Sequence, residues 1–350
     1  VGFFQMTMKN GMRCSAAAAY LKPIRSRKNL HIITHAHTDK IEFDGKRATA
    51  VMVRVRGKSQ RIKVGREIIL SAGSIGSPQI LMLSGIGDQN DLGKHGIEPT
   101  HHLPGVGRNL QDHLQARPVF KCNASTINTE TKNPLQLASI ALEYAFKRSG
   151  PMAMAASLGT AFLKTHDALE TPDIQFHLQP FSADSVAEGS HKFSAFTASV
   201  LQLRPESAGH LELVSANADD YPAIHPNYLA TKTDCDTIVA GIKIARAVCQ
   251  TEPVKSLITE EYAPGAAVAD DDDAILDWAR NTATTIYHPT GTCKMGQDKM
   301  AVVDEKLRVY GVQNLRVADA SIMPVITSGN TNAPTIMIGE KLSDLILEAV

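Results

Sequence analysis

The sequence predicts an α/β domain assembled from both ends of the chain and an α+β domain inserted between them. Near each end, short strand-like runs lead through glycine turns into apolar helices, at residues 60–87 and 314–350. Between about residues 120 and 285 the pattern changes to amphipathic helical spacing and longer strand-like runs. We therefore expect one domain from residues 1–120 and 288–350, and a second domain from residues 121–287.

The first end of the chain contains four predicted features. The alanine-rich residues 14–21 predict a helical segment, with Ser15 as its candidate cap. The β-rich residues 29–43 predict a strand that continues into another after the Asp44-Gly45 hairpin signal. Residues 60–87 predict a strand, then a glycine-broken turn, then an apolar helix with Pro78 near its first turn. Residues 103–114 predict a Gly/Pro loop.

The middle and last segments alternate between the two periodicities. Helical spacing occurs at 135–150 and 234–250, and strand-like runs occur at 172–180 and 209–215. A short strand-like run at 314–324 precedes a closing helix at 333–350, which has Pro334 near its N-terminus. Internal repeats are not evident.

The bulk composition excludes several classes of function. Thirty-six basic residues balance thirty-six acidic ones, so nothing predicts a nucleic-acid or polybasic membrane partner. Five widely spaced cysteines without a C-x-x-C pair argue against a disulfide framework or a zinc knuckle. His35 with His37, and His101 with His102, lack a neighbouring carboxylate or third histidine, so we predict no metal site. No run is long enough to span a bilayer.

The decapeptide YHPTGTCKMG, residues 287–296, has the composition of a loop that holds a side chain in place. Its histidine, His288, could be a metal ligand, a proton-transfer base or a packed, hydrogen-bonded core residue. Taken alone, the packed residue is favoured. Cys293 is interpreted as a small packed residue, and the absence of a G-x-S-x-G elbow argues against a serine hydrolase.

Four stretches together resemble the glucose–methanol–choline (GMC) oxidoreductases, flavoenzymes that oxidise alcohols. They are GREIILSAGSIGSPQILMLSGIG (65–87), LPGVGRNLQDH (103–113), YHPTGTCKMG with VVDEKLRVYGVQNLRVADASIMP after it (287–324), and TSGNTNAPTIMIGEK (327–341). They stand in the family's order across nearly the whole chain and resemble the insect glucose dehydrogenase-like branch most.

The resemblance implies an α/β FAD-binding domain with an inserted α+β substrate domain, whose antiparallel sheet roofs the active site. It implies oxidation of the CH–OH group of an alcohol or sugar by hydride transfer to the flavin, with an external acceptor, a quinone or oxygen, and a dehydrogenase in preference to an oxidase. Secretion is plausible for the family, but the localisation itself is not predicted.

The resemblance also assigns site residues. His288 is implied as the base, and Asn330 as its partner, which orients the substrate oxygen because an amide cannot itself act as a base. Asp319 and Ala320 are implied as cofactor contacts, as are Asn330 and Thr331 at the start of the closing helix, where the positive end of the helix favours an anionic ring edge. Thr38 is implied to meet the adenine through its backbone.

One family element is not found in the sequence. The G-x-G-x-x-G turn that receives the FAD pyrophosphate is absent; GVGRNL begins correctly but has Leu110 at the third glycine. Since the chain opens at Val1 without Met or a signal peptide, we expect the C-terminal part of a longer enzyme, with a partial FAD domain that lacks the first βαβ unit. The alternative is a truncated, FAD-free inactive fragment or binding fold of the same family.

Overall fold

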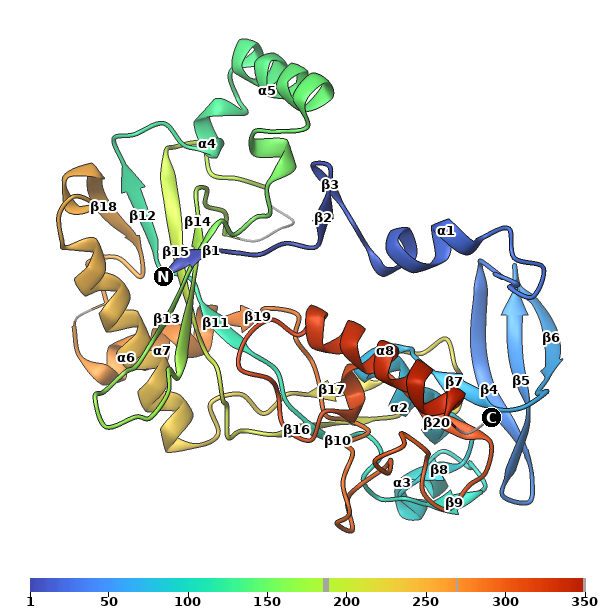
Figure 1. The fold of residues 1–350 in the computed structure, drawn as a ribbon. Helices are drawn as coiled ribbons and strands as arrows, with labels where there is room; N and C mark the ends of the chain where they lie inside the picture. Colours follow the sequence, from blue (N-terminus) through green and yellow to red (C-terminus); the bar gives the residue numbers. More distant parts are fainter. Residues whose placement is uncertain (185–188, 269, 349–350) are drawn as a thin grey trace. The chain divides into compact units, whose positions relative to one another are not determined.

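The protein is described by a computed structural model that covers residues 1–184, 189–268 and 270–348. Its chain forms two compact units (Figure 1). The first unit comprises Val1–Leu30, Leu114–Leu203 and Thr231–Ile286, and the second comprises His31–His113, Arg204–Ala230 and Tyr287–Val350.

The first unit is built on an antiparallel sheet of eight strands. Its path runs β1–β13–β14–β15–β11–β19, and β12 pairs with both β15 and β18. The strands are β1 (Gly2–Phe3), β11 (Leu114–Ala116), β12 (Val119–Cys122), β13 (Gly159–Leu163), β14 (Ile174–Gln179), β15 (Ala195–Gln202), β18 (Ile258–Ala263) and β19 (Thr284–Thr285). Six consecutive pairs join β14 to β15, from Ile174 opposite Gln202 to Gln179 opposite Thr197.

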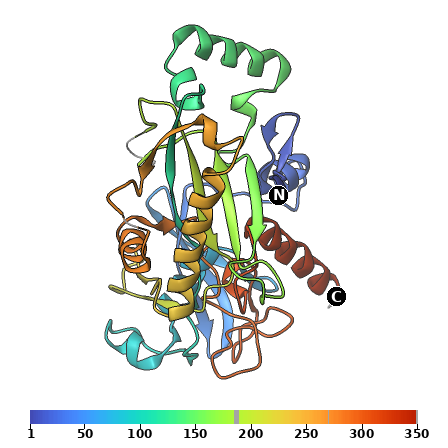
Figure 2. The ribbon, with the colours of Figure 1, turned by 90° about the vertical axis from the view of Figure 1, so that its left-hand side faces the viewer.

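Helix α6 (Lys232–Cys249) lies along one face of this sheet (Figure 2). Gly241 permits the close approach, because a Cβ there would lie 2.7 Å from Cγ2 of Val200 on β15. Phe120, Ala198 and Cys249 pack together between sheet and helix. The remaining elements of the unit are β2 (Met8–Lys9), β3 (Met12–Arg13), η1 (Ala17–Leu21), α1 (Lys22–Ile24), α4 (Ile127–Glu130), α5 (Pro134–Lys147), η2 (Pro151–Ala153), η3 (Lys255–Leu257) and α7 (Asp272–Thr282).

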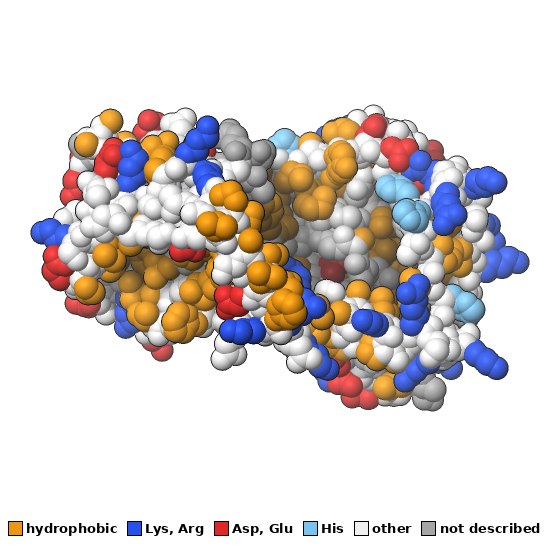
Figure 3. Space-filling view, turned by 90° about the horizontal axis from the view of Figure 1, so that it is seen from above, with side chains coloured by type: hydrophobic (Ala, Val, Ile, Leu, Met, Phe, Trp, Pro, Cys, Tyr) orange, Lys and Arg blue, Asp and Glu red, His pale blue; other side chains and the backbone are white. Residues whose placement is uncertain are grey.

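Helix α5 carries no buried residue. Leu135, Leu142 and Phe146 of this helix are all exposed, which fits a helix that projects from the sheet (Figure 2). Figure 3, which views the molecule from above, shows hydrophobic side chains interspersed with charged ones on the visible face.

The second unit contains several small sheets. An antiparallel sheet is formed by β4 (Ala36–Asp44), β5 (Arg47–Val55) and β6 (Lys58–Lys63), and another by β10 (Arg108–Leu110), β16 (Gly209–Glu212) and β17 (Ala223–His225). Two parallel pairs accompany them: β7 (Ile68–Leu70) with β20 (Leu315–Val317), and β8 (Ile86–Gly87) with β9 (His101–His102).

The helices of the second unit are α2 (Gly73–Leu83), α3 (Gln89–Gly93), η4 (Ala320–Ile322) and α8 (Asn332–Leu347). One hydrophobic core joins α2, the β7–β20 pair and the segment after residue 293. Leu81, Val302 and Val317 in this core have no exposed surface. The residues that precede α2 and follow β20 are therefore fixed against the same core, and this places the polar groups considered below.

Several sequence predictions are confirmed and one is wrong. The Asp44-Gly45 hairpin joins β4 to β5, and Pro334 lies in the first turn of α8. The fold is mixed α/β with antiparallel sheets, as expected. Pro78 was expected near the first turn of its helix, but α2 begins at Gly73 and Pro78 lies inside it. Pro78 has no N–H and cannot donate to the carbonyl of Ser74, four residues earlier. Helix α2 can nevertheless begin at Gly73, because the hydroxyl of Thr292 donates to that carbonyl at 2.7 Å.

The compact units have other boundaries than the two predicted domains. One domain was predicted from residues 1–120 and 288–350, and the other from residues 121–287. Residues 1–30 group with the large sheet, where Gly2 pairs with Thr160, and residues 204–230 group with the second unit, where β16 pairs with β10. Whether the two units are a cofactor domain and a substrate domain stays a prediction. No helix among the described residues is both long and apolar enough to cross a bilayer.

Candidate active site

The loop at residues 287–296 is held on both sides by backbone hydrogen bonds. Thr290 and Gln111 exchange both of their N–H···O bonds, at 2.8 and 3.1 Å. On the other side, the N–H groups of Gly291, Cys293 and Met295 donate to the carbonyls of residues 320–322 at 3.2, 2.8 and 2.7 Å. The loop is thus fixed like a strand between two neighbours, which removes conformational freedom from the histidine that it carries.

Gly291 is required by this arrangement. Its φ of +87° lies in the region that favours glycine. A Cβ at this position would also lie 2.4 Å from the carbonyl oxygen of Asn109, which no real Cβ atom tolerates. The glycine therefore allows the loop to approach the chain before Gln111.

The ring of His288 is buried, with 8% of the residue exposed, and has a partner at each nitrogen. Its Nδ1 lies 3.0 Å from Nδ1 of His113, and its Nε2 lies 3.3 Å from the side-chain nitrogen of Asn330. The two imidazole rings meet edge to face at 81°. The backbone N–H of His288 donates to Oδ1 of Asp112 at 2.9 Å, so main chain and ring are positioned separately.

The Asn330 amide, whose nitrogen faces the ring, favours one tautomer of His288. An amide nitrogen can only donate, so Nε2 accepts from Asn330 and carries the lone pair. The proton of the neutral ring is then on Nδ1, which donates to Nδ1 of His113. Nε2 is the nitrogen that can take up a proton. Asp112, in turn, accepts the hydroxyl of Tyr228, which fixes the carboxylate that holds the His288 backbone.

Asp319 connects the start of α2 to the turn after β20. Its Oδ2 accepts the N–H of Gly73 at 2.9 Å and the hydroxyl of Ser77 at 2.6 Å, while Oδ1 accepts the N–H of Ser321 at 2.8 Å. The hydroxyl of Ser74 donates to the carbonyl of Pro289 at 2.7 Å. The start of α2, the Asp319 turn and the His288 loop are therefore one hydrogen-bonded assembly.

Helix α8 begins beside Asn330. Its N-cap residue Thr331 is buried and makes no side-chain capping hydrogen bond. The first turn of the helix also contains no acidic side chain. An uncapped helix start concentrates partial positive charge, which favours an anionic group.

The structure brings five of the six predicted site residues into this assembly. Asn330 contacts His288, and Thr331 is the next residue after Asn330. The carbonyl of Ala320, the residue after Asp319, accepts the N–H of Gly291. The carboxylate of Asp319 is engaged within the protein, so its role as a cofactor contact stays a prediction. Thr38 lies instead in β4, opposite Val53 of β5.

Sequence reasoning missed His113, Asp112 and Tyr228. The stretch LPGVGRNLQDH was predicted to be a loop and contributed to the family resemblance, but none of its residues was given a role, although Asp112-His113 places two polar side chains before a strand. That adjacency was the available signal. Cys293, by contrast, is packed as expected: burial raises the pKa of its thiol well above the ordinary range, and no part of it is exposed.

Two family models, both described as GMC oxidoreductase, match residues 1–115 and 205–339. The chain is 40% identical to the alcohol dehydrogenase [acceptor] of Pseudomonas putida over 353 residues, which cover 100% of this chain and 64% of the relative. It is 42% identical to the mitochondrial choline dehydrogenase of Homo sapiens, covering 99% of this chain and 58% of that protein. The chain thus spans about three fifths of the length of these relatives.

Solved structures have the same fold. A formate oxidase matches with a TM-score of 0.90 at 26% identity, covering 97% of this chain and 64% of that chain. Pyridoxine 4-oxidase from Mesorbium loti matches with a TM-score of 0.83 at 27% identity, covering 96% and 62%. These comparisons do not distinguish a glucose dehydrogenase-like branch, which stays a prediction.

Proposed function

The chain belongs to the GMC oxidoreductase family, and we propose that the whole protein oxidises the CH–OH group of an alcohol or sugar with FAD. The family and its solved neighbours are FAD-dependent flavoproteins. The proposal assigns His288 as the base that accepts the hydroxyl proton and Asn330 as the group that orients the substrate oxygen.

The geometry of His288 carries this assignment. A buried imidazole whose Nδ1 is tied to His113 presents Nε2 as its basic atom, and Asn330 donates toward that same atom. A substrate hydroxyl could donate to Nε2 of His288 in place of Asn330, whose amide nitrogen now lies 3.3 Å from that atom. The amide would then donate to the substrate oxygen. Gly291 and Asp112 hold the loop and the backbone of His288, so the ring is fixed before substrate arrives.

The residues present fit a flavin. The uncapped start of α8 offers N–H groups and partial positive charge to an electron-rich ring edge. The side-chain oxygen of Thr327 is buried and has no hydrogen-bond partner among the described residues. We infer that backbone at Asn330 and Thr331 holds the ring, that Asp319 and Ala320 contact the cofactor, and that the backbone of Thr38 meets the adenine. FAD, when bound, would accept the hydride from the alcohol carbon.

The names of the relatives suggest substrates and acceptor. The alcohol dehydrogenase [acceptor] and the mitochondrial choline dehydrogenase are 40% and 42% identical to this chain, and oxygen-dependent choline dehydrogenases are 39% and 40% identical. All of these relatives are named dehydrogenases, so we propose a dehydrogenase in preference to an oxidase, with a quinone or oxygen as its acceptor. A panel of choline, simple primary alcohols and glucose covers the substrate classes.

The test starts with the purified 350-residue chain and FAD. Absorbance after removal of free FAD and the shift in thermal unfolding measure binding. Each substrate is then mixed anaerobically with the loaded protein, and the loss of flavin absorbance gives the rate of oxidation. His288→Gln should retain FAD and lose roughly 100- to 10,000-fold in this rate. An unchanged rate in His288→Gln would remove His288 from the mechanism.

A colourless chain that FAD does not stabilise would favour the alternative function, an FAD-free fragment or binding fold of the family. The proposed absence of the first βαβ unit motivates that alternative, because the anion site of that unit contributes strongly to FAD affinity. The same substitution would then be examined in a longer chain that does load FAD.

A further inference from the structure

The β16–β17 hairpin brings three metal-ligating side chains to one face. His210 on β16 pairs directly with His225 on β17, and Glu212 follows His210 by two residues. Because side chains alternate across a strand, residues two apart share a face, and a directly paired residue joins them. One ligand atom from each of the three side chains lies within 4.8 Å of the other two.

The contacts within this cluster are already close to those of a metal site. Nε2 of His210 lies 3.1 Å from Oε1 of Glu212. Two ligands of a tetrahedral Zn²⁺ ion with bonds of 2.0–2.1 Å stand about 3.3 Å apart. The rings of His210 and His225 are stacked, with centroids 4.7 Å apart and planes 22° from parallel. Since His225 is exposed, its ring can turn so that one nitrogen points to the common centre.

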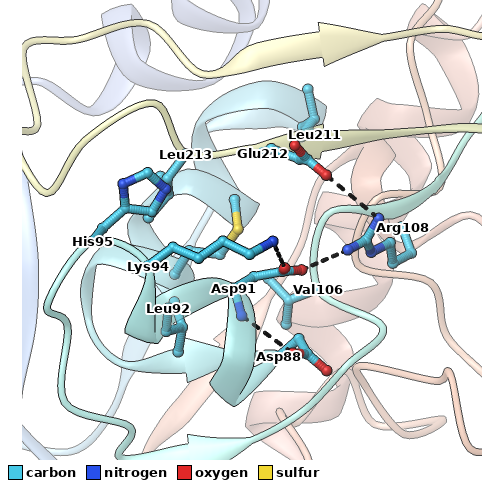
Figure 4. Close-up of a pocket in the computed structure, with 11 residues that line it drawn as sticks. Asp88, Asp91, Leu92, Lys94, His95, Val106, Arg108, Leu211, Glu212 and Leu213 are labelled. Carbon is cyan, nitrogen blue, oxygen red and sulfur yellow. Dashed lines mark hydrogen bonds and ion pairs between the residues drawn. The ribbon is translucent and has the colours of Figure 1, made fainter.

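The charged surroundings leave the carboxylate of Glu212 available. Figure 4 shows Arg108 of β10 directed between Asp91 and Glu212. Arg108 lies 2.6 Å from Asp91 but 4.0 Å from Glu212, so its charge is mainly satisfied by Asp91. At 4.0 Å Arg108 does not hydrogen-bond Glu212, and the carboxylate can therefore bind a cation together with the neighbouring His210.

We propose that His210, Glu212 and His225 form a binding site for Zn²⁺, with water completing the coordination. Two neutral imidazoles and a carboxylate are ligands that zinc prefers, whereas Mg²⁺ and Ca²⁺ select oxygen ligands. A bound ion would link β16 to β17 and stabilise the hairpin. The site is independent of the proposed oxidoreductase function.

The competing explanation is an ordinary His210–Glu212 ion pair beside a stacked histidine. Such a pair is one third to two fifths exposed, and exposed pairs contribute little to stability. The two explanations differ in one measurable respect, since only the zinc site requires His225.

Calorimetric titration of the chelator-treated 350-residue chain with ZnCl₂ tests the proposal. We expect one high-affinity site, an upward shift in thermal unfolding with Zn²⁺ and none with Mg²⁺. His225→Gln and Glu212→Gln should each weaken Zn²⁺ binding at least roughly tenfold. His31→Gln, which removes an exposed histidine outside the cluster, should bind as the parent chain does.

Zinc affinity that is equal in His225→Gln and the parent chain, or a parent chain without saturable binding, would overturn the proposal. If a variant does not fold, NMR of ring-labelled histidine in the unsubstituted chain decides instead. On addition of Zn²⁺ the signals of His210 and His225 should move together, and unchanged signals for this pair would contradict the site.

Discussion

Nδ1 of His113 lies 3.0 Å from Nδ1 of His288, although the two residues are 175 positions apart in the chain. Both rings are buried, His113 completely. One of the two nitrogens must donate and the other accept. Because the side-chain nitrogen of Asn330 faces Nε2 of His288, we infer that Nδ1 of His288 donates to His113 and that His113 supports the tautomer in which Nε2 is basic. His113 is thereby a positioning residue for the proposed base.

Substitution of His113 should disturb His288 without removing the base. In an FAD-loaded protein, His113→Leu should lower the rate of alcohol oxidation roughly tenfold or more, because Nδ1–H of His288 loses its acceptor. FAD binding should be unchanged. His113→Gln, whose side-chain oxygen can accept the same proton, should recover part of the rate.

The ¹⁵N signals of labelled histidine give a readout that a merely structural role would not change. The parent chain should show His288 protonated at Nδ1, and His113→Leu should show a mixture of tautomers. A single Nδ1–H tautomer in His113→Leu would remove His113 from this role.

Gly291→Ala should destabilise the second unit by about 2–4 kcal/mol, since the residue has a φ of +87° and the added methyl group meets the carbonyl of Asn109. Urea unfolding measures the change. Gly65→Ala is the matched control, because no atom of the residues that the structure describes lies within 4 Å of a Cβ at that position, and its φ is not restricted. Equal free energies of unfolding for the two variants would contradict the described loop geometry.

Thr292→Val should lower the free energy of unfolding by about 1–3 kcal/mol, although the side-chain volume hardly changes. The substitution removes the hydroxyl that donates to Ser74, and that carbonyl has no intrahelical donor because Pro78 lies four residues later. Thermal unfolding should show the loss, while Thr284→Val, at an exposed position of a strand, should change little. Unchanged stability in Thr292→Val would mean that another donor reaches the Ser74 carbonyl.

Asp304 should make stability depend on pH. Burial opposes its charged form, but the Arg308 guanidinium and the backbone N–H groups of Lys306 and Arg308 outweigh burial and hold the pKa of the carboxyl below its ordinary value. A lowered carboxyl pKa contributes stability above the unfolded-state value of about 4 and loses it as the pH falls.

Asp304→Asn should therefore be less stable than the parent chain at pH 7, by about 1–2 kcal/mol. The difference should begin to shrink as the pH falls below the unfolded-state value of about 4, and it should disappear only below the lowered pKa of the folded carboxyl. Urea unfolding across this range checks the prediction. A difference that is constant with pH would show that packing, and not charge, is what Asp304 contributes.

Much of the secondary structure followed from local pattern. The Asp44-Gly45 hairpin, the helices at 234–250 and 333–350, and the strands at 172–180 and 209–215 correspond to β4–β5, α6, α8, β14 and β16. Each of these depends on periodicity or turn chemistry within a few residues. Pro78 was misplaced because its tolerance inside α2 depends on Thr292, more than 200 residues later.

The sequence, through its resemblance to the family, determined which residues could carry chemistry: the loop around His288, and Asn330 just before the closing helix. Only the tertiary structure decided which groups face them. His113 reaches His288 because Gln111 and Thr290 pair across the loop, and His210 reaches His225 because β16 pairs with β17 in one particular register. Contacts of this kind depend on backbone hydrogen bonds between distant segments, and a change of register by one residue would turn each side chain to the opposite face.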